Sequence, residues 1–203
     1  MGSEMCIRDR AYFQRENDRF HRAYDEGTLD IHEYLTFALA PLTEHSCEQL
    51  DQWHRQFMIE RIEPIILPQG EALLNQHRER GDRILIITAT NRFVTAPIAR
   101  RLGIDDLIAV EPEMKDGRYT GQVAGIPSFQ EGKIRRLEQW LDQQNVSLDG
   151  AWFYSDSRND LPLLERVDNP VAVDPDPVLA DTARQRGWQI ITLRDRDKRH
   201  DSL

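Results

Sequence analysis

The chain has 203 residues, of which 39% are hydrophobic and 30% are charged, and it carries a formal net charge of −9. This length suits one α/β domain with a small appendage, and the composition is that of a folded protein rather than a disordered one. The negative charge argues against general nucleic-acid binding, which needs a basic face. No apolar run approaches the roughly 18 residues of a membrane span, so neither nucleic acid nor membrane is an expected partner.

The two cysteines and the first ten residues bear on where the protein works and where it starts. Cys6 and Cys47 form neither a disulfide framework nor a CxxC pair, which is consistent with a reducing cytoplasm. Residues 1–10 contain no apolar core of a signal peptide and share no periodicity with the helical pattern after them, and they resemble a cloning scar. We interpret them as a non-native leader, behind which the native start is missing.

Residues 11–68 are predicted to form a small helical cap. Aromatic residues recur at helical spacing as far as Gly27, which favours a first helix with an aromatic interior. A second helix is expected to start at the capping residue Asp30 and to end at Pro41, since proline disfavours a helical residue before it. A third, longer helix is expected over residues 43–62.

Residues 69–203 alternate apolar strands with amphipathic helices. This order predicts an α/β fold with a Rossmann-like, mainly parallel sheet and a functional site at the carboxyl ends of the strands. The pair Asp116–Gly117 adds the signal of a tight hairpin turn. The predicted strands are residues 83–88, 107–110, 151–155, 171–173 and 189–192. The predicted helices are residues 71–80, 93–102, 130–143, 161–167 and 177–186.

Polar residues follow several of these strands. Thr88 ends the first one, where its hydroxyl and the next amides, that of Ala89 included, could hold a phosphate. Lys133 lies near the start of a helix and supplies a point positive charge. Asp156 and Asp160 follow a buried strand, and two carboxylates at this spacing suit Mg²⁺. Each residue alone has a structural alternative, namely a turn, a solvated lysine or a helix cap; their order and placement favour a joint site.

That order of segments carries a resemblance. Residues 84–88, the pair Gly132–Lys133 and residues 154–160 resemble the second, third and fourth motifs of the haloacid-dehalogenase superfamily. The closest likeness is to its subfamily IB, the phosphoserine-phosphatase-like branch that includes histidinol-phosphate phosphatases, and residues 17–34 resemble the small helical cap of that branch. The resemblance implies a Mg²⁺-dependent phosphomonoesterase that acts on a small phosphorylated metabolite, such as phosphoserine or histidinol phosphate, through an aspartyl-phosphate.

The resemblance also implies roles for individual residues. The residues matching catalytic positions are Lys133 and Asp156. Those matching phosphate-binding positions are Thr88, Ala89, Lys133 and Asn159. Those matching metal-binding positions are Asp156 and Asp160.

The chain departs from the family at the first motif. An Asp-x-Asp-x-Thr/Val loop, which supplies the nucleophile and the general acid, does not occur before the cap. Asp174-Pro-Asp176 has the spacing, but it comes after the metal motif and is interpreted as a strand-end turn and helix cap. We therefore expect an N-terminally truncated protein whose sheet lacks its first, central strand and which is inactive as printed. The alternative is a non-catalytic phosphate-binding or regulatory module, and a different transfer chemistry such as phosphomutase action is a minor third.

Overall fold

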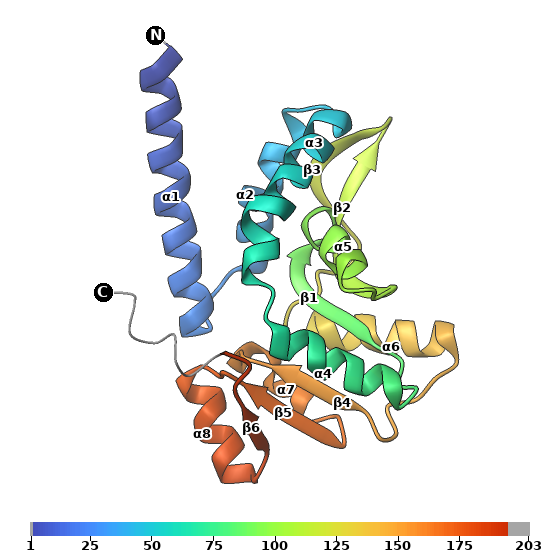
Figure 1. The fold of residues 1–203 in the computed structure, drawn as a ribbon. Coiled ribbons are helices and arrows are strands. Elements are labelled where there is room, and N and C mark those ends of the chain that lie inside the picture. Colours follow the sequence, from blue (N-terminus) through green and yellow to red (C-terminus); the bar gives the residue numbers. More distant parts are fainter. Residues whose placement is uncertain (1, 195–203) are drawn as a thin grey trace.

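The computed structural model describes residues 2–194, with side chains from residue 11 onward (Figure 1). The α-helices are α1 (Gly2–Glu26), α2 (Ile31–Thr43), α3 (Cys47–Phe57), α4 (Pro68–Glu79), α5 (Arg92–Arg101), α6 (Glu131–Gln144), α7 (Leu161–Leu164) and α8 (Pro177–Arg186). The strands are β1 (Leu85–Asn91), β2 (Asp106–Lys115), β3 (Arg118–Ala124), β4 (Trp152–Ser155), β5 (Asn169–Val173) and β6 (Gln189–Ile191). A π-helical turn η1 (Met58–Ile62) and the 3₁₀ turns η2 (Glu63–Ile65) and η3 (Arg158–Asp160) complete the described elements.

The strands form two three-stranded sheets instead of one. The orders are β1-β2-β3 and β4-β5-β6, and every pairing is parallel except that of β2 with β3. Within residues 2–194, β1 pairs with β2 alone and β4 pairs with β5 alone, so the other edge of each strand has no strand partner. The predicted α/β class with mainly parallel strands is therefore confirmed, whereas the expectation that a central strand is missing stays a prediction.

Helices α6 and α4 pack against the strands β1 and β4. On one side, α6 packs Leu137 against Leu85 and Ile87 of β1 and lies in the same apolar cluster as Phe153 of β4. On the other side, α4 places the buried His77 against β4, with its Nε2 atom 2.7 Å from the hydroxyl oxygen of Tyr154. Helix α6 thus packs against both β1 and β4, which are not hydrogen-bonded to each other, and α4 contacts β4 through His77.

The predicted hairpin is confirmed. Asp116 and Gly117 have φ angles of 51° and 74°, the left-handed conformation that a tight two-residue turn requires. The turn joins β2 to β3, and β3 packs against α2 through Tyr119 and Val123. This hairpin is the surface on which the second and third helices rest (Figure 1).

The helical first third differs in detail from the prediction. Pro41 does not end the second helix, because α2 continues to Thr43; the missing N–H falls near the helix end, and the Pro41 carbonyl still accepts from the Glu44 amide. The third helix is shorter than expected and starts after Ser46, whose side chain caps it. The division into a cap ending at residue 68 and a core stays a prediction.

Helix α1 contains the segment interpreted as a leader. The side chains of residues 1–10 lie outside the described part of the chain, so their non-native origin stays a prediction. Further along α1, Phe20 is buried and contacts the rings of Tyr34 and Phe37, whereas Tyr12 is half exposed. Tyr12 and Phe13 also contact the ring of Phe37 but remain exposed, so the buried part of the aromatic interior lies in the second half of α1.

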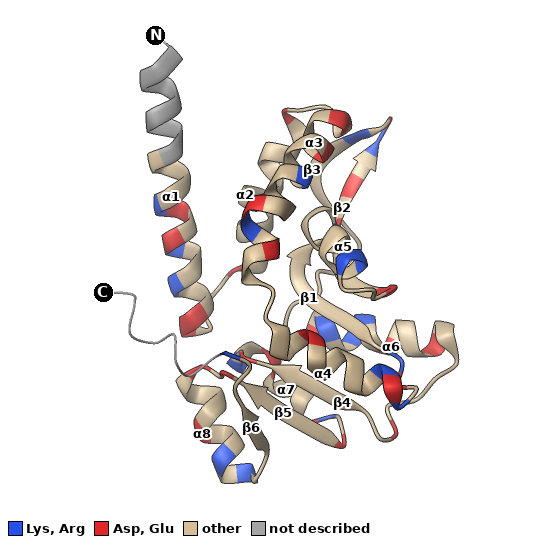
Figure 2. Ribbon diagram, viewed as in Figure 1, with Lys and Arg blue, Asp and Glu red and all other residues tan. Residues whose placement is uncertain are grey.

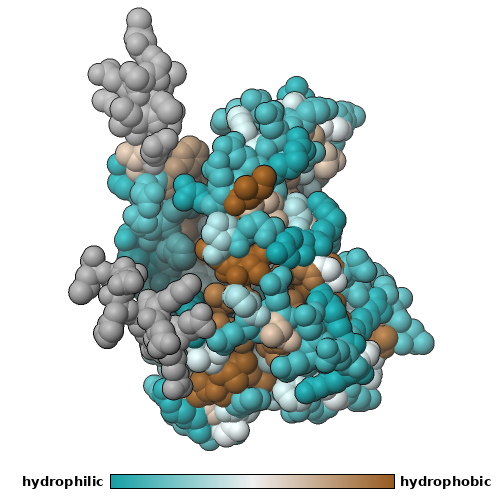
Figure 3. All heavy atoms as spheres, viewed as in Figure 1, coloured by the Kyte–Doolittle hydropathy of each residue, from teal (hydrophilic) through white to brown (hydrophobic). Residues whose placement is uncertain are grey.

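The surface shows charges of both signs and scattered apolar side chains. Acidic and basic residues alternate along α1 (Figure 2), and most of the face in Figure 3 is hydrophilic with separate apolar patches. Ile59, Ile65 and Leu67 are among the exposed apolar residues. None of the helices in residues 2–194 combines the length and the apolar character needed to cross a bilayer.

Candidate functional site

A cavity of about 480 Å³ lies between β1, β4 and the second half of α1. Its walls include Ile87 and Thr90 from β1, Phe153 from β4, and His21 from α1. The predicted site residues that line it are Thr88, Ala89, Lys133, Asp156 and Asp160. Five of the six positions selected from the sequence thus meet in one cavity, although they come from three separate stretches of the chain.

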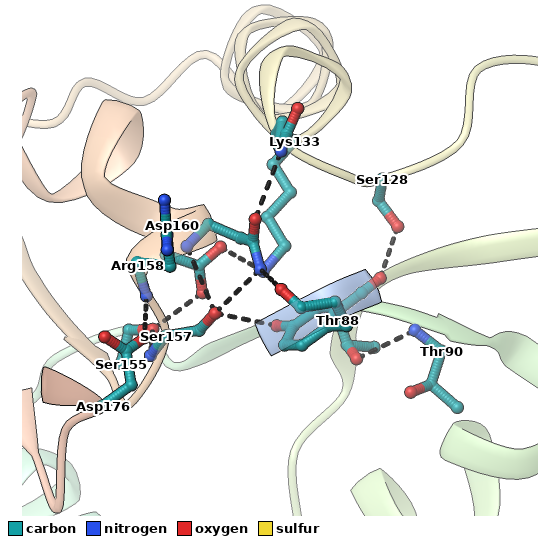
Figure 4. A network of polar contacts seen from close by, with 12 residues as sticks. Thr88, Thr90, Ser128, Lys133, Ser155, Ser157, Arg158, Asp160 and Asp176 are labelled. Atoms are coloured by element: carbon teal, nitrogen blue, oxygen red, sulfur yellow. Dashed lines mark hydrogen bonds and ion pairs between the residues drawn. The ribbon is translucent and has the colours of Figure 1, made fainter. Parts of the chain in front are cut away.

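Lys133 and Asp160 form a buried ion pair inside this cavity. The Lys133 Nζ atom lies 2.5 Å from Asp160 Oδ1, and the two side chains are 8% and 9% exposed. The second carboxylate oxygen of Asp160 accepts a hydrogen bond of 2.8 Å from the Ser155 hydroxyl. Figure 4 shows Lys133 pointing from its helix toward Asp160. Asp160 therefore acts as the counter-charge of Lys133. Its role as a metal ligand stays a prediction, and it would use the lone pairs that these two contacts leave on the carboxylate.

A close backbone approach brings Lys133 to this position. The first turn of α6 packs against the preceding loop so tightly that a Cβ atom on Gly132 would lie 2.0 Å from the carbonyl oxygen of Pro127. The Gly132 amide donates to the carbonyl of Phe129 in the same turn. Only glycine fits here, and the pair Gly132–Lys133 selected from the sequence therefore has a steric reason.

Thr88 is not the last residue of its strand, contrary to the prediction, because β1 continues to Asn91. The regular pairing of β1 with β2 is nevertheless interrupted after Ile87. There the Thr88 hydroxyl accepts a hydrogen bond of 3.1 Å from the amide of Thr90, and the Thr88 carbonyl accepts one from the hydroxyl of Ser128. Thr88 thus occupies a turn-like irregularity at the cavity, where its backbone leaves the ladder.

Asp156 comes directly after β4 and is exposed to the cavity. Within the described part of the chain, its carboxylate makes no hydrogen bond or ion pair, while its backbone carbonyl accepts from the amide of Asp176 at 2.8 Å. The next helical turn is capped by Ser157, whose hydroxyl accepts from the amide of Asn159. The capping alternative thus applies to Ser157, and the carboxylate of Asp156 faces the cavity.

Asn159 joins this loop to α1 rather than lining the cavity. Its side-chain amide donates to the carbonyl of Tyr24 at 3.3 Å, and its side-chain oxygen accepts from Gln130 at 3.2 Å. Its predicted contact with phosphate stays a prediction. The Tyr24 hydroxyl in turn donates to Ser157 at 2.9 Å.

Tyr24 is a site residue that sequence reasoning missed. Burial raises the pKa of its hydroxyl, and the carboxylates of Asp160 and Asp156 raise that pKa further against hydrogen bonds that lower it. The hydroxyl therefore stays protonated at neutral pH and remains a donor. The only sequence signal was the aromatic periodicity of residues 11–24, which indicates packing and not a site.

Asp174 and Asp176 have no place in this cavity. Asp176 caps α8, with one carboxylate oxygen accepting from the amide of Leu179 at 2.9 Å and the other from the amide of Arg158 at 2.5 Å. The interpretation of Asp174-Pro-Asp176 as a strand-end turn and helix cap is confirmed.

The donor set for a metal is small. Among the described residues, no group of three or more His, Cys, Asp or Glu side chains could hold a metal ion. Among the described residues, the carboxylate of Asp156 has no hydrogen-bond or ion-pair partner and lies at the cavity wall. Mg²⁺ commonly uses one or two protein carboxylates and completes its shell with water and phosphate oxygens, so this residue fits such an ion when a phosphate is present.

The fold and the convergent site define a hydrolase of the haloacid-dehalogenase type. The profile of the haloacid dehalogenase-like hydrolases matches residues 5–165. The chain belongs to this family, and its relatives place it among the family's phosphatases. The resemblance inferred from the three ordered motifs is thereby confirmed.

Two relatives with named activities are similar to most of this chain. The chain is 44% identical over 190 residues to a histidinol-phosphatase of Neisseria meningitidis, an alignment that covers 92% of this chain and 86% of that protein. It is 31% identical over 187 residues to the phosphoserine phosphatase SerB1 of Mycobacterium tuberculosis, covering 92% of this chain and 61% of that protein.

Solved structures agree on the fold. A protein of unknown function from Bordetella pertussis Tohama I is 44% identical and superimposes with a TM-score of 0.84, over 89% of this chain and 82% of that one. A phosphoserine phosphatase solved as a phospho-aspartyl intermediate analogue is 19% identical and superimposes with a TM-score of 0.65, over 89% of this chain and 80% of that one.

Proposed function

We propose that the cavity binds the phosphoryl group of a small phosphorylated metabolite together with Mg²⁺. It would supply the phosphate-binding and metal-binding residues of a phosphomonoesterase site. The observation that supports this most is the convergence of Thr88, Lys133 and Asp156 on one cavity. Histidinol phosphate is the first candidate, because the relative that is 44% identical is a histidinol-phosphatase. Phosphoserine is the second, and either substrate would place the protein in amino-acid biosynthesis.

Each residue has a defined contribution in this proposal. Lys133 neutralises the phosphoryl oxygens, and Asp160 holds its ammonium group in place. The backbone of Thr88 and Ala89 would offer amides where the pairing of β1 with β2 is interrupted. Asp156 would hold Mg²⁺, which supplies further positive charge next to the phosphate.

The opposite wall would contact the organic part of the substrate. It comes from α1 and the start of α2, and it presents the polar side chains of Asn17, His21 and Tyr34 to the cavity. These groups are suited to hydrogen bonds with an amine or an imidazole. Specificity is therefore proposed to lie in this wall rather than in the phosphate-binding residues.

We further propose that the printed chain binds phosphoryl compounds without hydrolysing them. The cavity wall contains two carboxylates, those of Asp156 and Asp160, and the second is neutralised by Lys133. Attack on phosphorus through an aspartyl-phosphate needs a further carboxylate. The same observation favours the second candidate function, a non-catalytic phosphate-binding or regulatory module. Both functions would place the protein in the cytoplasm, in keeping with the free thiol of Cys47.

Phosphate release from histidinol phosphate and from phosphoserine tests this proposal, with the purified 203-residue chain and Mg²⁺. We expect no release above that of the variants Lys133→Ala and Asp156→Asn. Turnover that both variants abolish would show that the printed chain is an active phosphatase. Turnover that survives in both would show that the reaction occurs elsewhere and that the site assignment is wrong.

A further inference from the structure

The turn that leads into α6 holds Gln130 in a strained backbone conformation. Its φ and ψ angles are 45° and −120°. These angles are close to those of the first central residue of a type II′ turn, a position that glycine usually occupies. The amide of Gly132 closes the turn by donating to the carbonyl of Phe129 at 2.8 Å. The chain therefore places a glutamine where the backbone favours glycine, and the conformation persists only because the surrounding structure enforces it.

The residues before Gln130 fix this turn to two other stretches of the site. Ser128 is fully buried, and its hydroxyl donates to the carbonyl of Thr88 (Figure 4). Phe129 is also buried, and the centroid of its ring lies 6.1 Å from that of Tyr24. Gln130 therefore cannot adopt a relaxed backbone unless β1, α1 or the start of α6 moves.

The side chain of Gln130 reaches the loop that follows β4. Its Nε2 atom donates to the side-chain oxygen of Asn159 at 3.2 Å. Asn159 is itself buried, and its amide group donates to the carbonyl of Tyr24 and to the hydroxyl of Ser157, at 3.3 Å each. A glycine at position 130 would remove the strain but would lose this contact. The contact with Asn159 is therefore what a glutamine supplies here and a glycine does not.

Two side-chain contacts join the start of α6 to this loop. Lys133 pairs with Asp160 at 2.5 Å, and Gln130 donates to Asn159. One contact limits the distance between two segments but permits rotation about it, whereas two contacts fix their relative orientation as well. That orientation determines where the carboxylate of Asp156 lies relative to the ammonium group of Lys133.

We propose that Gln130 is a positioning residue of the phosphate site, which through Asn159 aligns the loop of Asp156 with the helix of Lys133. In that alignment, a Mg²⁺ ion held by Asp156 and the ammonium group of Lys133 act on one phosphate, and a small displacement of either weakens their joint effect. Gln130 itself does not line the cavity. Its role rests on the proposed phosphate and Mg²⁺ site, to which it adds no ligand of its own.

Two variants separate positioning from a purely structural role. Gln130→Ala removes the side-chain contact and keeps the unfavourable φ angle, whereas Gln130→Gly removes both the contact and the strain. The melting temperature of Gln130→Gly should therefore be about 2–4 °C above that of Gln130→Ala. In calorimetric titrations with inorganic phosphate, the affinity measured with Mg²⁺ should fall about threefold to tenfold in both variants, as expected for one lost hydrogen bond. The affinity without Mg²⁺ should equal that of the parent chain, because Lys133 keeps its pair with Asp160.

Asn145, at the other end of α6, provides the matched control. It is exposed and also has a positive φ angle, of 52°. Asn145→Ala and Asn145→Gly should therefore differ in melting temperature in the same direction, yet both should keep the full effect of Mg²⁺. If Gln130→Ala does not fold, Gln130→Gly, which relieves the strain, decides the question alone.

The results that overturn the positioning role differ from those that overturn the phosphate site. The role of Gln130 is refuted alone if both variants keep the parent's affinity with Mg²⁺, or if their affinities differ as their melting temperatures do. An equal loss of affinity with and without Mg²⁺ also contradicts it, because the metal side of the site would then not be affected selectively. A parent chain that binds no phosphate, or whose affinity does not respond to Mg²⁺, would refute the proposed function and this role with it.

Discussion

Replacing Lys133 by methionine is expected to lower the free energy of unfolding by about 3–5 kcal/mol, because the carboxylate of Asp160 then remains buried without its counter-charge. The hydroxyl of Ser155 alone does not neutralise that charge. Urea denaturation of the variant and of the parent chain measures the difference. The double variant Lys133→Met with Asp160→Leu should recover much of the loss, since it removes both charges together.

The matched control is Lys115→Met. Lys115 is also paired with a carboxylate, that of Glu113, but its side chain is 69% exposed. An exposed pair contributes at most about 1 kcal/mol. If Lys133→Met destabilised the protein no more than Lys115→Met does, the Lys133–Asp160 pair would not be a buried ion pair.

Replacing Gly132 by alanine should cost about 1–3 kcal/mol or more of folding stability and should weaken phosphate binding as well. The added Cβ atom meets the carbonyl oxygen of Pro127 at 2.0 Å, so backbone must move, and overpacking of this kind is destabilising. Any shift of the first turn of α6 displaces the ammonium group of Lys133. Thermal unfolding and phosphate titration of the same variant measure the two effects.

Gly70→Ala is the control for this variant. Gly70 lies in α4, and a Cβ atom there meets nothing closer than 3.9 Å. Alanine is the better helix former by about 1 kcal/mol, so this substitution should be neutral or stabilising. Equal effects of Gly132→Ala and Gly70→Ala would contradict the steric role of Gly132.

Much of the site could be predicted from the sequence because its parts obey local rules. Apolar runs that end in polar residues located Thr88 and Asp156, and parallel topology brings such ends together. The Asp116–Gly117 turn was equally local, since its left-handed conformation favours these residue types. Lys133 could be predicted as a site residue because it lies between two other motifs in the expected order. The structure adds the steric reason why Gly132 precedes it.

The features that could not be predicted depend on contacts between distant residues. Nothing in the sequence indicated that Asp160 would give both carboxylate oxygens to Lys133 and Ser155, because that arrangement arises only when α6 and the loop after β4 meet. The hydrogen bonds of Tyr24 to the same loop span more than a hundred residues of the chain. The length of α2 beyond Pro41 likewise depended on its packing against β3, which overrides a local preference.

Lys133, Thr88 and Asp156 are proposed to form a phosphate site assisted by Mg²⁺, and calorimetric titration of the chain with inorganic phosphate, with and without Mg²⁺, decides whether they do. We expect one saturable site whose affinity rises with Mg²⁺, and a loss of that rise in Asp156→Asn, an exposed substitution that preserves the fold. Affinity should fall about tenfold or more, or about 1.4 kcal/mol, in Lys133→Met. A folded parent chain that binds no phosphate, or an unchanged Mg²⁺ effect in Asp156→Asn, would contradict the proposed site.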